Sequence, residues 1–109
     1  MIYKLLEEVE EKEVEELKEM FDEVVDLTRN NPDFSILMLR KKNIVIFHCV
    51  GGYLCKTVAI NFNTSDDAET FSKITKEFTR HFGGLAFDVE SYVNFVKNSF
   101  ELEVVGLNE

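Results

Sequence analysis

A stretch of 30 residues without an acid constrains this chain more than any other feature of its sequence. The chain has 21 Asp and Glu and a net charge of −9, yet residues 34–63 hold no acid and four cations. Residues 1–33 hold 12 acids against four cations (−8), and residues 64–109 hold nine against four (−5). Because ionised side chains stay in water, we expect the flanking segments to cover the central one.

Composition indicates one globular domain spanning residues 1–109, since 45% of the residues are hydrophobic and 30% are charged. Charges near the N-terminus interrupt the apolar core that a signal peptide would need. No run approaches the roughly 18 apolar residues of a membrane span. We therefore expect a cytoplasmic protein without membrane contact.

The N-terminal third predicts a helix of about 20 residues, on the spacing of its apolar side chains. Residues 2–6 fit either an extension of this helix or a short strand. The Glu residues lie mostly on the opposite face, and Arg29 to Pro32 form a plausible stop. The apolar stripe consists of Val14, Leu17, Phe21, Val24 and Thr28.

The acid-free stretch predicts three short strands rich in β-branched and aromatic residues. Two more helices and a last strand follow, and Thr64 with Asp67 resembles a capping box. The fold class is α+β, of order α-β-β-β-α-α-β, with an antiparallel sheet of three to four strands packed against helices. The predicted strands span residues 34–40, 44–50, 53–62 and 100–105. Of the two later helices, one begins after residue 64 and the other spans residues 89–97.

A two-residue turn at Gly51-Gly52 would place His48 opposite Cys55 and fix which side chains share a face. One face is then apolar apart from Arg40 and Lys56, and we expect it to be the core face. Its apolar members are Phe34, Ile36, Met38, Val45, Phe47, Cys49, Leu54, Val58, Ile60 and Phe62.

The opposite face mixes apolar and polar side chains, so it is too apolar to be left in water. Exposed apolar patches of this kind mark interfaces, and a symmetric dimer is the commonest soluble assembly. We expect a homodimer through this face; the alternative is that a helix of the same chain folds over it. The predicted dimer face is Leu37, Leu39, Ile46, Val50 and Tyr53.

The two cysteines and His48 are the residues most able to carry chemistry. In the predicted register Cys49 and Cys55 point to opposite faces, which disfavours a disulfide and fits a reducing compartment. His48 with Cys55 could ligate a metal or act as base and nucleophile, but the strands supply no carboxylate to orient them. Phosphate-binding and hydrolase motifs are absent. We expect no metal, no cofactor and no enzymatic activity.

Arg40, Lys41 and Lys42 form the basic cluster at a predicted hairpin tip. Such a tip could contact phosphate, or it could be a solvated turn whose lysines prevent edge pairing. The solvated turn is favoured, because the net charge of the chain repels phosphate.

These observations favour a non-enzymatic acidic interaction protein that binds a basic protein partner. One concrete form is an inhibitor that imitates the charge of nucleic acid. The alternatives are a nucleic-acid-binding protein using the basic tip, and a small thiol/histidine enzyme or ligand-binding domain using His48, Cys55 and Tyr53. The acids expected to meet the partner project from the first helix: Glu8, Glu11, Glu15, Glu19, Asp22 and Glu23.

Overall fold

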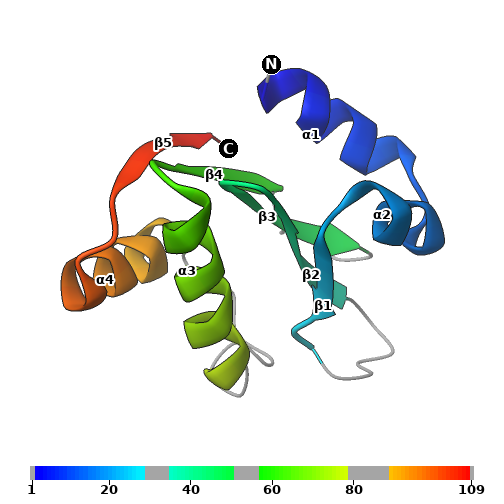
Figure 1. The fold of residues 1–109 in the computed structure, drawn as a ribbon. Coiled ribbons are helices and arrows are strands. Elements are labelled where there is room, and N and C mark those ends of the chain that lie inside the picture. Colours follow the sequence, from blue (N-terminus) through cyan, green and yellow to red (C-terminus); the bar gives the residue numbers. More distant parts are fainter. Residues whose placement is uncertain (1, 29–34, 51–56, 79–88, 109) are drawn as a thin grey trace.

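A five-stranded antiparallel sheet lies between two layers of helices in the computed structural model (Figure 1). The structure describes residues 2–28, 35–50, 57–78 and 89–108. Helices α1 and α2 lie on one face of the sheet, and α3 and α4 lie on the other. The strands follow the order β1-β2-β3-β4-β5, so each strand pairs with its neighbours in the sequence.

The α+β class and the antiparallel sheet agree with the sequence prediction, but the order is α-α-β-β-β-β-α-α-β. The chain therefore has one more helix and one more strand than predicted within its described residues. The elements are α1 Ile2–Glu11, α2 Val14–Met20, β1 Glu23–Asp26, β2 Ser35–Lys41, β3 Ile44–Val50, β4 Val58–Phe62, α3 Ser65–Glu77, α4 Val89–Phe100 and β5 Val104–Asn108.

The single N-terminal helix is the main error of the sequence prediction. The chain leaves the helical conformation at Glu13 (ψ 159°) and again at Phe21 (ψ 151°). Val24 and Val25 then belong to β1, the edge strand of the sheet, where they pair with Leu39 and Met38 of β2. Valines are stiff at χ1 and favour strands, so this part of the apparent stripe is a strand with side chains on both faces.

The pairing of β3 with β4 differs from the predicted register by two residues. Val45 pairs with Ile60 and Phe47 with Val58, whereas a two-residue turn would pair Phe47 with Lys56. The Gly51-Gly52 turn itself lies outside the described residues. Because the side chains of a strand alternate with a period of two, an even shift leaves every side chain on its predicted face.

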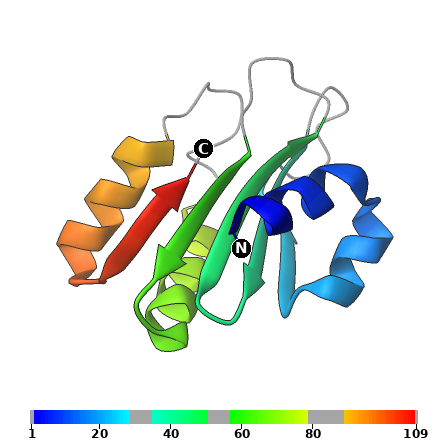
Figure 2. The same cartoon turned by 90° about the horizontal axis from the view of Figure 1, so that it is seen from above.

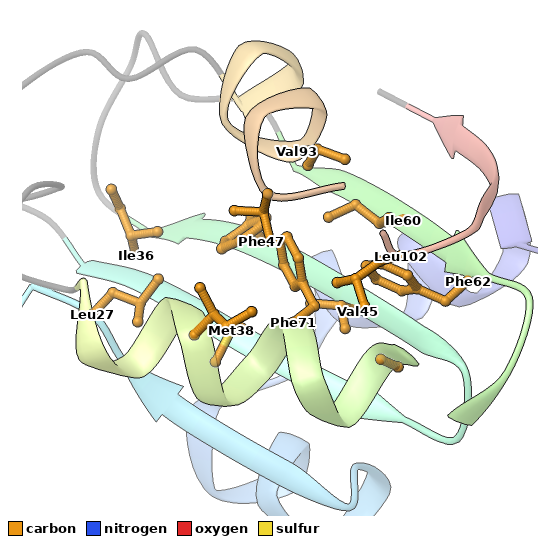
Figure 3. Close-up of a cluster of buried hydrophobic side chains, with 13 residues drawn as sticks. Leu27, Ile36, Met38, Val45, Phe47, Ile60, Phe62, Phe71, Val93 and Leu102 are labelled. Carbon is orange, nitrogen blue, oxygen red and sulfur yellow. The ribbon is translucent and has the colours of Figure 1, made fainter. Parts of the chain in front are cut away.

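The predicted core face is confirmed for the residues that the structure describes, and Figure 3 shows its packing. Phe71 of α3 lies at its centre, with ring centroids 5.9 Å from Phe47, 5.1 Å from Phe62 and 5.8 Å from Tyr92 of α4. Phe34 and Leu54 lie outside the described residues. Leu27, which follows β1, belongs to this cluster, and its side chains from the strands include Ile36, Met38, Val45, Phe47, Ile60 and Phe62.

The other face of the sheet is covered by α1 and α2, as Figures 1 and 2 show. Leu37 is 4% exposed, and Leu39 and Ile46 are fully buried. Their assignment to an exposed dimer face is therefore wrong, because helices of the same chain occupy that face. The side chains of Val50 and Tyr53 lie outside the description. The covering residues are Leu6, Val9, Leu17 and Phe21, with Leu5 and Met20 beside them.

Capping interactions set where α3 begins and α4 ends. The hydroxyl of Thr64 accepts a hydrogen bond from the backbone N–H of Asp67 at 3.1 Å, which confirms the predicted helix start. At the end of α4, Glu101 has a φ of 55° and the N–H of Leu102 donates to the carbonyl of Lys97. This is a Schellman-type ending, with a glutamate where glycine is usual. The last strand therefore begins at Val104, later than predicted.

Among the described helices, none combines the length and the apolar character needed to cross a membrane.

Replacing Leu17 with alanine should test the cover over the second sheet face. Leu17 is 1% exposed, so Leu17→Ala should lower the free energy of unfolding by about 2–5 kcal/mol. Val14 on the same helix is 39% exposed, and Val14→Ala should change stability far less. Urea unfolding followed by circular dichroism measures both. Equal losses for the two variants would contradict the packing of α2 on the sheet.

Candidate functional site

The outer surface of α1 and α2 is the most strongly charged part of the described chain. Residues 2–20 carry eight Glu against three Lys, a net of −5. Seven of those glutamates are exposed and Glu8 is half-buried. Lys12 pairs with Glu16 at 3.5 Å and Lys18 with Glu15 at 3.3 Å, both on the surface. Such exposed pairs contribute little to stability. Because the glutamates outnumber the lysines, the layer remains a negative surface.

The predicted partner-binding acids do not form one helical row. Glu8 and Glu11 belong to α1, whereas Glu15 and Glu19 belong to α2, and residues 12 and 13 break the helix between them. Glu11, Glu15 and Glu19 are exposed as expected. The structure thus places these three acids on the outer layer but on two separate helices.

Asp22 and Glu23 lie apart from this row and belong to a cluster around Arg40. Arg40 Nη1 lies 3.9 Å from Asp22 Oδ2 and 3.8 Å from Glu69 Oε1, and its Nε lies 3.7 Å from Glu23 Oε1. Asp22 and Glu23 follow α2 and enter β1, while Glu69 comes from α3. The cluster therefore links three elements at one end of the sheet.

Glu23 is the most constrained acid of this cluster. It accepts hydrogen bonds from Ser72 and from Lys76 of α3, the latter at 2.7 Å. Burial alone would raise the pKa of Glu23, but the hydrogen bonds from Lys76 and Ser72 and the charges of Lys76 and Arg40 outweigh it and hold the pKa below 4.5. Glu23 thus joins β1 to α3, and its carboxylate is held by these contacts.

The basic tip does not present three free cations. The side chain of Arg40 is only 16% exposed and lies within reach of three carboxylates. Lys42, with a φ of 55°, donates its backbone N–H to Asp22 Oδ2 at 2.8 Å. Of the other two cations of the tip, Lys42 is exposed and Lys41 is half-buried, and Asp22 of the Arg40 cluster contacts the backbone of Lys42.

His48 is buried on the face that α1 and α2 cover. It is 7% exposed, and its Nδ1 lies 3.0 Å from the hydroxyl of Thr57. Burial lowers the pKa of His48, and the nearby negative charge of Glu10 opposes this shift more weakly. The predicted neighbour Cys55 lies outside the described residues. The imidazole is a hydrogen-bonded interior group, which does not favour its use as a solvent-accessible base.

Cys49 is disulfide-bonded, so the expectation that it is a reduced thiol is wrong. The argument against a disulfide assumed that the two strands stay paired as far as a two-residue turn, whereas the described pairing of β3 with β4 ends at Phe47 and Val58, before either cysteine. Cys55, the other cysteine of the sequence, lies outside the described residues. In the described part of the chain, no group of three or more His, Cys, Asp or Glu side chains could hold a metal ion.

Sequence reasoning missed the α3 side of the Arg40 cluster. Glu69, Ser72 and Lys76 recur at helical spacing on α3, beside its apolar stripe. The signal for this cluster was the isolated Arg40 on an otherwise apolar strand face, because a half-buried guanidinium requires nearby acceptors.

Comparison with protein-family models, with curated proteins and with solved structures finds no significant match to this chain.

Replacing Glu23 with glutamine should destabilise the protein in a pH-dependent way. The folded pKa lies below the ordinary value of 4.5, so the stabilisation is complete above that pH and is lost as the pH falls below it. Urea unfolding of wild type and Glu23→Gln should therefore differ clearly at pH 7 and converge in more acidic buffer. The matched control is Glu19→Gln on the exposed surface of α2. A gap that persists unchanged in acid would contradict this assignment.

Titration of His48 gives an independent test of the covered face. Its folded pKa lies below the ordinary value of 6.5, so folding disfavours protonation and stability decreases as the pH falls below 6.5. We expect NMR titration to give a pKa below 6.5 for His48, in a His81→Gln background that leaves one histidine. His48→Gln should reduce the loss of stability between pH 8 and pH 5.5. An ordinary pKa would show that water reaches this side chain.

Proposed function

We propose that this chain is a non-enzymatic interaction protein that binds a basic protein surface through the outer layer of α1 and α2. The observation that supports this most is the division of that layer into two faces. Its inner side chains cover the sheet, whereas its exposed side chains include seven glutamates, among them Glu11, Glu15 and Glu19. Dimerisation through Leu37, Leu39 and Ile46 is not part of this proposal.

Electrostatics provides the mechanism of capture. A surface with a net charge of −5 attracts cations and speeds association with a basic partner, and the rest of the chain adds the same sign. Glutamates spread over two short helices resemble the phosphates of nucleic acid in the sign of their charge. The protein would thus occupy a groove whose lysines and arginines otherwise meet nucleic acid, as an inhibitor does.

Two alternatives have weaker support. A nucleic-acid-binding tip would need Arg40, whose guanidinium is surrounded by Asp22, Glu23 and Glu69. An enzyme would need an accessible reactive group, and His48 is buried beside Thr57. The other two residues predicted for that enzyme, Tyr53 and Cys55, lie outside the described residues.

Charge reversal tests the proposal directly. Affinity capture from the native host, with proteins and nucleic acids both identified, should recover a basic protein whose retention weakens with salt. Glu11→Lys, Glu15→Lys and Glu19→Lys together should abolish this retention, because they remove three negative charges from the layer and add three positive ones.

The matched control reverses the charge of three exposed acids that lie outside α1 and α2, in α3, in α4 and directly after α4. Glu77→Lys, Glu90→Lys and Glu101→Lys give the same net charge, and all three positions are exposed. We expect this variant to retain the partner. Equal retention by both triple variants would reject the acidic layer as the binding surface, and recovery of nucleic acid alone would favour the basic tip.

A further inference from the structure

The two edges of the sheet differ in how they are protected. An edge strand exposes unpaired backbone N–H and C=O groups, which natural proteins protect with charges, proline, bulges or covering elements. At one edge, β1 is four residues long, begins with Glu23 and ends with Asp26, and α2 packs beside it. At the other edge, β5 has the sequence Val-Val-Gly-Leu-Asn, which contains neither a charge nor a proline.

The outer strand β5 is also open on one of its faces. Val104 and Leu107 pack against the core on the α3–α4 side, whereas Val105 is 63% exposed. A Cβ built on Gly106 would meet no heavy atom within 4 Å. Helix α1 lies over the inner strands and does not extend above β5 (Figure 2). A bulge at Val105, where Asn61 pairs with Gly106 and Phe62 with Val104, is the one protective feature that the described residues give this edge.

Charges on α4 and in the segment that leads into β5 indicate what could pair with this edge. Between residues 89 and 108 the exposed acids are Glu90, Glu101 and Glu103, and the sole cation is Lys97, a net of −2. A second copy of β5 would bring the same acids alongside and would be repelled. An extended segment that carries lysine or arginine between apolar residues would be attracted, and its backbone would match the open edge.

We propose that the outer edge of β5 accepts an extended segment of a basic protein as an added antiparallel or parallel strand. The backbone of the segment hydrogen-bonds to β5, an apolar side chain covers Val105, and basic side chains meet the flanking glutamates. This binding mode differs from capture by the α1–α2 layer and does not require it.

A synthetic peptide of alternating lysine and valine is the probe. When it is added to the full-length chain, amide hydrogen exchange measured by NMR should slow in β5, and the affected resonances should centre on residues 104–108. Val105→Lys adds the edge charge that natural proteins use and should weaken binding about tenfold or more. The matched control Val14→Lys changes another exposed valine, on α2, and should leave the affinity within about twofold.

The remaining outcomes each overturn the proposal. Equal binding of a glutamate–valine peptide would remove the role of charge. Slow exchange of β5 in the free chain that depends on protein concentration would show self-pairing. Perturbation confined to α1 and α2 would show capture by the acidic layer alone.

The triple variant at Glu11, Glu15 and Glu19 should retain the β5 response, which separates failure of this proposal from failure of the proposed function.

Discussion

Burial of β2 and β3 on both faces is the constraint on which the rest of this structure depends. Ile36 to Leu39 and Val45 to His48 are all buried, so these two strands need a layer of helices on each side. The helices in turn must present an apolar face inward. Those that cover the second face are short, ten residues in α1 and seven in α2, and helices of that length are marginal in isolation. Their stability comes from the sheet that they cover.

The alternation of side chains along the strands made the faces of the sheet predictable from the sequence. The two N-terminal helices could not be predicted in this way. An error of two residues in register left Phe47 and Ile60 on the correct face, because parity survives an even shift. The helical spacing of apolar residues did not tolerate an error in the same way. Val24 fits the helical stripe that begins at Val14, and the pairing of Val24 with Leu39 in the sheet overrides that pattern. Short apolar runs are ambiguous between helix and strand until their partner is known.

The candidate site was predicted in composition but not in arrangement. The exposure of Glu11, Glu15 and Glu19 agrees with the sequence, since glutamates seldom enter a core unpaired. Asp22 and Glu23 went elsewhere because Arg40 stands on the core face of β2 and needs carboxylates within reach. No local pattern reveals this pairing, which joins residues 17 or more positions apart. The apolar face assigned to a dimer was misjudged for the same reason, since its cover comes from residues 5–21.

The acidic layer and the apolar sheet face beneath it are consequences of one another. A helix placed over Leu37 and Ile46 must direct Leu6, Val9 and Leu17 inward, which leaves its other positions for solvent. Glutamate at those positions keeps a strongly apolar sequence soluble. A surface with a mixture of positive and negative side chains would also keep the chain soluble. Eight Glu against three Lys is not such a mixture. The core therefore fixes the position of the layer, while the excess of one sign is the feature that a binding function would explain.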